Sequence, residues 1–363
     1  MIQNYFLYIF IGITLLQILF FCIVFGKTVF TKKKALPPKR IPISVLVYVK
    51  NNKNTFIRLM SQLETQQYHN FEIVLVMHTI SEEMIQVCRE FAVMYENVRL
   101  ANLTNDTLYN CSKSYITGIA VKAANNKHIL LIDSDQTITS DQWIWQMSAN
   151  FTMKKNVVIG MSHWKKEKGI FNKWLRFQQQ WEWIQNLSFS RICNPFSLYP
   201  QNLGFQIENI YDKYSNIDLK TREYLGNELL FPEFAQKSNT FWCELPIVSL
   251  ETPAPKNRKE WNFQKKQQYF QKNRQSWGTN IFSFLHLNSI ILSYLVTPIA
   301  ILLFPQYIIE IASCFVAFWA IRWMYFSIYF NKINQKDLKI WYPFFEISWL
   351  IGNIKWFPYT LKK

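Results

Sequence analysis

Apolar and polar positions divide the chain into a central stretch of short alternating elements and long apolar runs near both ends. Residues 5–25 carry no charge and are about as long as a helix needs to cross ~30 Å of hydrocarbon. No basic start or small-residue cleavage site marks them as a signal peptide. We therefore predict a transmembrane anchor over 1–26. The following linker, 27–40, is basic, so the positive-inside rule predicts that it and the domain after it are cytoplasmic.

Two further apolar runs, 289–304 and 307–325, lie near the carboxyl end and are separated by a Pro-Gln pair. This pattern predicts a transmembrane helical hairpin over 279–330, with a buried pair of core helices as the alternative. Glu310 and Arg322 fall inside the second run, and charges are costly in lipid. We therefore expect both side chains to face protein or the membrane interface.

The last segment, 331–363, contains a shorter apolar stretch, "IWYPFFEISWLIGNIKWF". A proline, a glutamate and a lysine interrupt it, and its three tryptophans are typical of the region where lipid headgroups meet water. The pattern predicts an interfacial or membrane-embedded segment, with the interfacial position favoured.

The central stretch, 41–278, alternates between two apolar periods. "ISVLVYV", "FEIVLVMH", "VRLANL" and "HILLID" have the continuous apolar pattern of buried strands, and segments with helical spacing separate them. Strands that alternate with helices predict βαβ units, an α/β class and a Rossmann-like, mostly parallel sheet. In such a sheet ligands bind at the carboxyl ends of the strands.

The composition and charge of the chain indicate which kinds of partner it can bind. The chain has 363 residues, half of them hydrophobic, and its 40 Lys and Arg exceed its 24 Asp and Glu to give a formal charge of +16. Many lysines lie beside the apolar runs, where anionic lipid accounts for them, so we expect a membrane and no nucleic acid. Six cysteines without CxxC or Cys/His spacing argue against a disulfide framework or a zinc site and fit a reducing compartment.

Two aspartates mark the candidate chemistry. Asp133 and Asp135 directly follow the apolar core of "HILLID", at the carboxyl end of a predicted strand. Carboxylates spaced in this way can share a divalent cation, or divide between a metal and a ribose hydroxyl. A solvated pair at a strand end is the alternative that the spacing alone leaves open.

Five motifs, in order, resemble those of the family-2 inverting glycosyltransferases, which are nucleotide-sugar enzymes of the GT-A fold. In detail the chain looks like the membrane-anchored members found in Bacteroidetes. The motifs are "ISVLVYVKNNKNTFIRLMSQLETQQYHNFEIVLV", "SKSYITGIAVKAANNKHILLIDSD", "LYPQNLGF", "YLGNELLF" and "PKNRKEWNFQKKQQYF". They resemble the first strand with its Arg-Asn-Glu turn, the helix leading to Asp-x-Asp, a Gly-x-Asn-Leu-Ala-Tyr segment, the acidic motif, and the Gln-Lys-Arg-Arg segment.

The resemblance implies a role for particular residues. Asp135 would hold Mn²⁺ or Mg²⁺, and Asp133 would assist it or bind the ribose. Glu228 would accept the proton of the acceptor hydroxyl, although an ordinary glutamate at a helix start is the alternative. The residues expected near the donor's nucleotide and diphosphate are lysines, each of which could also be a solvated surface lysine: Lys50, Lys113, Lys265 and Lys266.

The implied function is a membrane-bound transferase of hexosyltransferase type. It would move a sugar from a nucleotide-diphosphate donor to a lipid-linked or cell-surface glycan acceptor at the cytoplasmic face of a bacterial inner membrane. The nucleotide-binding motifs are degenerate: Asn52 replaces the glutamate of the first turn, Met77 and His78 stand where an aspartate is usual, and "QKKQQ" lacks arginines. The alternative is therefore a weak or inactive relative that serves as a subunit of a glycan-assembly complex.

Overall fold

The chain was analysed as a computed structural model, which describes residues 2–31, 34–37, 39–78, 80–103, 113–195, 202–208, 235–272 and 277–360. A few of these, near helix ends, are described by their backbone alone. The chain forms two compact units. The helical unit comprises Met1–Lys32, Gly169–Phe196 and Gln275–Lys363, and the sheet unit comprises Lys33–Lys168 and Ser197–Arg274.

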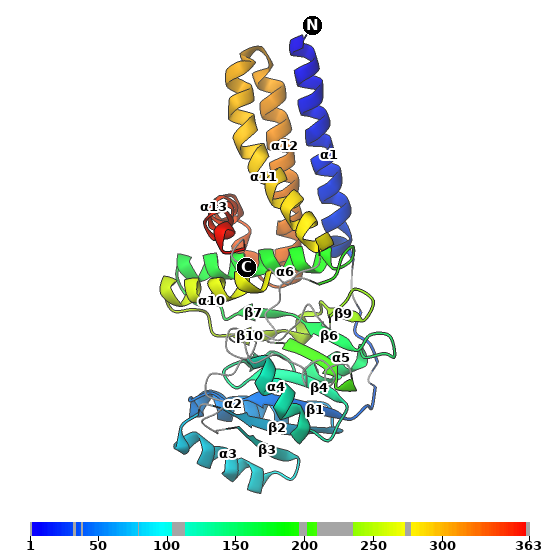
Figure 1. Cartoon of the computed structure of the whole chain (residues 1–363), viewed down its shortest axis with the longest axis vertical. Coiled ribbons are helices and arrows are strands. Elements are labelled where there is room, and N and C mark those ends of the chain that lie inside the picture. Colours follow the sequence, from blue (N-terminus) through cyan, green and yellow to red (C-terminus); the bar gives the residue numbers. More distant parts are fainter. Residues whose placement is uncertain are drawn as a thin grey trace. The chain divides into compact units, whose positions relative to one another are not determined.

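The sheet unit is built on a seven-stranded sheet in the order β3-β2-β1-β4-β8-β6-β9 (Figure 1). Its strands are β1 (Ile43–Tyr48), β2 (Phe71–Met77), β3 (Val98–Asn102), β4 (His128–Asp133), β6 (Val157–Gly160), β8 (Leu203–Gln206) and β9 (Thr240–Cys243). The first four strands of the order run parallel, and β6 runs parallel to β9. Only β8 among these described strands is antiparallel to its neighbours. The prediction of a mostly parallel α/β sheet is confirmed.

A second, three-stranded sheet has the order β5-β10-β7. Its strands are β5 (Thr137–Ile138), β7 (Ser162–Trp164) and β10 (Leu250–Thr252). β5 begins two residues after Asp135, so this small sheet continues directly from the strand end that carries the aspartates. The helices and 3₁₀ turns of the sheet unit are α2 (Lys53–Glu64), α3 (Glu82–Met94), α4 (Lys113–Ala120), η2 (Val121–Ala123), α5 (Trp143–Ala149), η4 (Pro246–Val248) and α10 (Arg258–Lys272).

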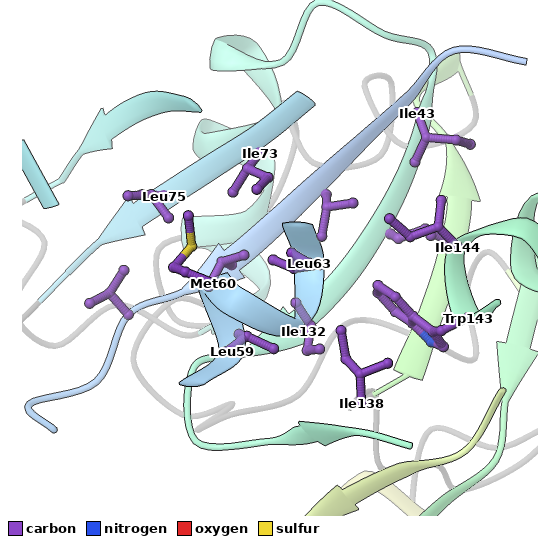
Figure 2. Packing of buried hydrophobic residues seen from close by; sticks show 14 of the residues in the cluster. Ile43, Leu59, Met60, Leu63, Ile73, Leu75, Ile132, Ile138, Trp143 and Ile144 are labelled. Carbon is purple, nitrogen blue, oxygen red and sulfur yellow. The ribbon is translucent and has the colours of Figure 1, made fainter. Parts of the chain in front are cut away.

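The core of the sheet unit joins strands to helix α2. Asn52 caps the amino end of α2 by accepting a hydrogen bond from the Thr55 amide at 3.1 Å. The buried residues of α2 recur at helical spacing, so one face of this helix packs on the sheet. Figure 2 shows Leu59, Met60 and Leu63 of that face among residues of β1, β2, β4 and α5. Burial of this face fixes α2 and, through its cap, the loop that follows β1.

The helical unit contains α1 (Ile2–Phe30), α6 (Ile170–Phe189), α11 (Trp277–Leu303), η5 (Pro305–Tyr307), α12 (Ile308–Lys332), η6 (Lys336–Leu338) and α13 (Tyr342–Thr360). Among the described residues, three helical stretches are long and apolar enough to cross a membrane: Leu7–Phe30, Ser283–Leu303 and Pro305–Lys332. The Pro-Gln pair opens the third stretch, in η5 between α11 and α12. The transmembrane hairpin remains a prediction. α13 does not meet the same criteria.

Helix α6 is the organising element of the helical unit. Trp181 on α6 stacks on Phe326 of α12 with ring centroids 4.1 Å apart and also contacts Trp349 of α13 at 4.6 Å. The sequence assigned this helix to the central domain because it lies inside 41–278, whereas the structure groups it with the apolar helices. Most of its polar side chains are buried, and a sequence pattern cannot show which unit covers them. The boundaries at 41 and 278 remain a prediction.

Candidate active site

The strand register brings the first loop and the aspartates together. β1 and β4 are parallel neighbours, and Tyr48 at the end of β1 lies opposite Asp133 at the end of β4. The residues that follow each strand therefore emerge at the same edge of the sheet. The Ser134 amide donates to the Tyr48 carbonyl at 2.9 Å, and the Lys50 amide donates to the Ser134 hydroxyl at 2.9 Å. These bonds hold the two loops side by side.

The side chain of Lys50 lies between the two aspartates. Its Nζ is 3.2 Å from Oδ2 of Asp133 and 2.8 Å from Oδ2 of Asp135. The Lys50 side chain is 45% exposed, whereas those of Asp133 and Asp135 are 7% and 23% exposed. Burial acts to lower the pKa of the Lys50 ammonium, but the charges of the two carboxylates outweigh it and raise the pKa above its ordinary value.

The carboxylates are held by a tight turn. The Asp133 amide donates to Oε1 of the fully buried Gln136 at 2.8 Å, and Gln136 Nε2 donates to Thr252 Oγ1 of β10 at 3.0 Å. Arg58 of α2 lies on the other side, with Nη2 3.4 Å from the Asp135 carbonyl oxygen. Oδ1 of Asp135 is buried without a hydrogen-bond partner among the described residues. The turn thus presents a carboxylate oxygen that the surrounding protein leaves unsatisfied.

The side chain of Tyr48, at the end of β1, is also buried. The hydroxyls of Tyr48 and Thr117 of α4 form a hydrogen bond beneath the strand ends. Burial raises the pKa of the Tyr48 phenol, the bond to Thr117 opposes that rise, and the Asp133 charge adds to it. Tyr48 therefore stays neutral and supports the site as a hydrogen-bonding group.

An acid–imidazole pair lies on the small sheet. Thr137, Glu251 and His163 are aligned across β5, β10 and β7, which places their side chains on one face. Nε2 of His163 is 3.8 Å from Oε1 of Glu251, and the imidazole lowers the pKa of that carboxyl. The positive charge of Arg58 lowers it further. Arg58 therefore connects the Asp135 turn electrostatically with the Glu251 carboxylate.

Of the remaining predicted site residues, the structure describes the side chain of Lys265 alone. Lys265 on α10 is 3% exposed, and its Nζ lies 4.5 Å above the ring of Trp261. That ring meets Trp164 of β7 edge to face with centroids 5.2 Å apart. Lys113 begins α4 and Lys266 lies in α10, but their side chains are outside the described part of the structure, as is the whole of Glu228. The site roles of these residues remain predictions.

Sequence reasoning missed five residues that shape the site. Ser134 lies between the two aspartates and Gln136 directly follows them, so their spacing from the strand end was the available signal. Arg58 is one of several polar residues on α2, and nothing in its surroundings marks it. The pairing of His163 with Glu251 depends on β7 and β10 lying side by side, although the two residues are 88 positions apart in the sequence, 251 less 163.

A comparison with protein families gives a match over the part of the chain that carries the turn and the first strands. Residues 41–191 match the profile of the family described as "Glycosyltransferase like family 2". The match covers 151 of the 363 residues, from 41 to 191. The matched range contains β1, the Lys50 loop, β4 and both aspartates. No protein of curated function matches the chain in sequence.

One solved structure has a similar fold over nearly the whole chain. The mannosyltransferase PcManGT from Pyrobaculum calidifontis, in complex with GDP-Man and Mn²⁺, aligns over 97% of this chain and 100% of its own, with a TM-score of 0.50 and 12% identity. TarS from S. aureus (residues 1–349, in complex with UDP-GlcNAc) aligns over 47% of each chain, with a TM-score of 0.34 and 16% identity. The first likeness shows that the chain has a GT-A-like fold.

The residues at the β4 end fit a divalent cation that binds together with a substrate. Asp133 and Asp135 supply carboxylate oxygens at a strand end, and Oδ1 of Asp135 lacks a partner. The described residues contain no group of three or more His, Cys, Asp or Glu side chains that could hold a metal ion. This donor set suits Mg²⁺ or Mn²⁺, which are usually bound by one or two carboxylates, with water and substrate phosphates completing the shell.

Proposed function

We propose that this glycosyltransferase family 2 protein is a membrane-bound inverting enzyme. It transfers a hexosyl group from a nucleotide-diphosphate sugar to a lipid-linked or cell-surface glycan acceptor. The observation that carries the proposal is the pair Asp133–Asp135 at the carboxyl end of β4, with the Lys50 ammonium beside both. Anionic donors and the cations that accompany them bind at this edge of a GT-A sheet.

The chain's own residues divide the work as follows. Asp133 and Asp135 hold the cation, which when bound stabilises the charge that builds on the leaving diphosphate. Lys50 supplies a further positive charge at the same edge. Glu228 accepts the proton of the acceptor hydroxyl as that oxygen attacks the anomeric carbon, which inverts the configuration there. Lys113, Lys265 and Lys266 contribute to the donor site.

The membrane part of the proposal rests on the apolar helices. Three stretches meet the length and composition of a membrane span, and basic residues flank them at 27–40 and 332–339. Under the positive-inside rule both basic flanks face the cytoplasm of a bacterial inner membrane, with the sheet unit on the same side. An accessibility map with a cysteine at the fully exposed Met153 tests this. A label that reaches position 153 only from outside the cell would reject the topology.

A second candidate function is an inactive subunit of a glycan-assembly complex. It is favoured by Lys50, since an ammonium already neutralises part of the charge on the two carboxylates. The degenerate turn and "QKKQQ" segment point the same way, because each lost carboxylate or arginine removes a contact to donor.

One experiment separates the two functions. The purified full-length protein is screened against nucleotide sugars with Mn²⁺, and donor binding and slow donor hydrolysis are both measured. An enzyme should bind one nucleotide class and hydrolyse its sugar at a rate that depends on the divalent cation. Absence of binding to every donor would reject the transferase proposal and leave the subunit.

A further inference from the structure

The ammonium of Lys50 lies where a cation shared by Asp133 and Asp135 would lie. Its Nζ contacts Oδ2 of both carboxylates, at 3.2 and 2.8 Å. Oδ1 of Asp135 has no partner among the described residues, so Lys50 is the cation paired with this carboxylate there. A divalent cation held by Asp133 and Asp135 would therefore compete with the Lys50 ammonium for these two carboxylates.

We propose that Lys50 is a built-in counterion of the Asp133–Asp135 pair that a divalent cation must displace. Free metal ion then binds weakly, and strong binding requires the metal to arrive with the donor diphosphate. The displaced ammonium then pairs with the phosphate oxygens that come with the metal. This inference rests on the proposed function only in naming a nucleoside diphosphate as the accompanying ligand.

Charge explains why the two ligands would bind together. Two carboxylates and one ammonium carry a net charge of about −1, which attracts a divalent cation less than the bare pair would. A diphosphate brings its own negative charge and oxygen ligands, so the metal gains partners while Lys50 gains an anion to replace the aspartates. Donor and metal should therefore strengthen each other's binding, and this coupling is reciprocal.

The structure lets Lys50 move without disturbing the fold. Its backbone amide is fixed by the Ser134 hydroxyl at 2.9 Å, whereas its side chain is 45% exposed. A lysine stem has four rotatable carbons and ends in a compact charge. The ammonium can thus leave the carboxylates by changing rotamer, while β1 and the turn after β4 stay in place.

The first test measures Mn²⁺ affinity of the full-length protein in detergent, without nucleotide, from the loss of the free-ion electron paramagnetic resonance signal. Lys50→Met keeps the stem and removes the charge, and it should bind Mn²⁺ about tenfold more tightly than the wild type, which is the scale of losing a partly exposed competing ion pair. Lys50→Arg keeps the charge and should retain the weak binding. Equal Mn²⁺ affinity in the wild type and Lys50→Met would overturn the proposal.

Arg58→Gln is the matched control, because it removes a positive charge that lies near Asp135 but does not lie between the carboxylates. Nη2 of Arg58 contacts the Asp135 carbonyl at 3.4 Å. This variant should change Mn²⁺ affinity less than about threefold, since screened charges beyond direct contact act weakly. A gain as large as that of Lys50→Met would show a general charge effect and would also reject the proposal.

The second test adds UDP or GDP to the same titrations. The wild type and Lys50→Arg should both gain more Mn²⁺ affinity from the nucleoside diphosphate than Lys50→Met does. An equal gain in all three variants would contradict displacement of Lys50. If no nucleotide binds but Lys50→Met still binds free Mn²⁺ about tenfold more tightly, the counterion role stands and the transferase function fails. The two ideas are thereby tested separately.

Discussion

Nε of Arg322 lies 3.0 Å from Oε1 of Glu346, and neither side chain has exposed surface. The pair joins α12 to α13. Glu346 also accepts hydrogen bonds from the hydroxyls of Tyr294 at 2.7 Å and Tyr342 at 2.8 Å. The expectation that Arg322 would face protein is confirmed, whereas Glu310 is exposed in the first turn of α12. The charge of Arg322 inside an apolar run is thus balanced by Glu346 of a neighbouring helix.

The first prediction follows from this pair. Arg322→Met should lower the free energy of unfolding by about 3–5 kcal/mol, because it leaves the Glu346 carboxylate buried without its counter-charge. The double variant Arg322→Met, Glu346→Gln removes that charge and keeps one acceptor oxygen beside the two tyrosines, so it should be more stable than the single variant. Thermal unfolding in detergent measures both. A double variant no more stable than the single one would contradict this account.

The second prediction concerns Gly160 at the end of β6. A Cβ atom added there would lie 2.6 Å from Cγ of Asn202. That amide cannot turn aside, since it donates to the carbonyls of Met161 and Val248 at 2.7 Å and accepts from Trp143 Nε1 at 3.0 Å. Gly160→Ala should therefore destabilise the protein by about 1–3 kcal/mol.

Gly12→Ala is the control for that variant, because an added Cβ at Gly12 meets nothing within 4 Å and alanine favours a helix. It should leave the melting temperature unchanged or raise it. Equal melting temperatures for Gly160→Ala and the wild type would show that Asn202 is not held as firmly as its hydrogen bonds indicate.

The same asparagine shows how far the sequence could go. "QNLGF" was recognised through resemblance, and the structure gives Asn202 a physical role, because its side chain bonds Trp143 of α5, Val248 of η4 and Met161, which directly follows β6. Strands β1 to β4 and α2 were predictable because their apolar periods are clear and local. The antiparallel β8 and the grouping of α6 with the apolar helices were not, since both depend on which distant element covers a given face. Asp133 and Asp135 were predictable from their place at a strand end, whereas the contact with Lys50 needed the register.

The third prediction is a pH dependence at Glu251. The neighbouring imidazole of His163, 3.8 Å from Oε1 of Glu251, lowers the pKa of the folded carboxyl below its ordinary 4.5. A carboxyl of this kind adds stability above the unfolded pKa and loses it as the pH falls through the lower folded value. Glu251→Gln should thus be less stable than the wild type at pH 7 by up to about 1 kcal/mol, as for partly exposed pairs, and the difference should vanish near pH 3.

Melting temperatures across that range check the effect. Glu96→Gln makes the same chemical change at an exposed glutamate and should show no comparable trend between pH 3 and 7. A stability difference for Glu251→Gln that grows toward acid pH would have the wrong sign and would remove the His163 contact from the explanation.

The fourth prediction concerns the metal. Asp135→Asn should abolish divalent-dependent donor binding while changing the free energy of unfolding by less than about 1 kcal/mol, because its side chain is partly exposed at a strand end and contributes little to the core. Asp141→Asn, the same change at an exposed aspartate, should bind donor and Mn²⁺ as the wild type does. Titration of nucleotide with and without Mn²⁺ measures both variants. Normal Mn²⁺-dependent binding in Asp135→Asn would show that the Asp-x-Asp pair does not hold the metal.

The last prediction decides between an enzyme and an inactive subunit, and it concerns Glu228. This residue lies outside the described part of the chain, so its role comes from the resemblance of "YLGNELLF" to the acidic motif. Proton transfer by a placed base contributes about 10²–10⁴ in rate. Glu228→Gln keeps the shape and removes the base, so turnover should fall by that factor while donor affinity barely changes. Glu223→Gln and Glu233→Gln are matched controls from the same segment and should keep most of the activity. Full turnover in Glu228→Gln, with a large loss in either control, would move the base to that neighbour. Since the acceptor hydroxyl must lose a proton whichever residue accepts it, an active wild type whose rate survives all three substitutions must place its base on another element.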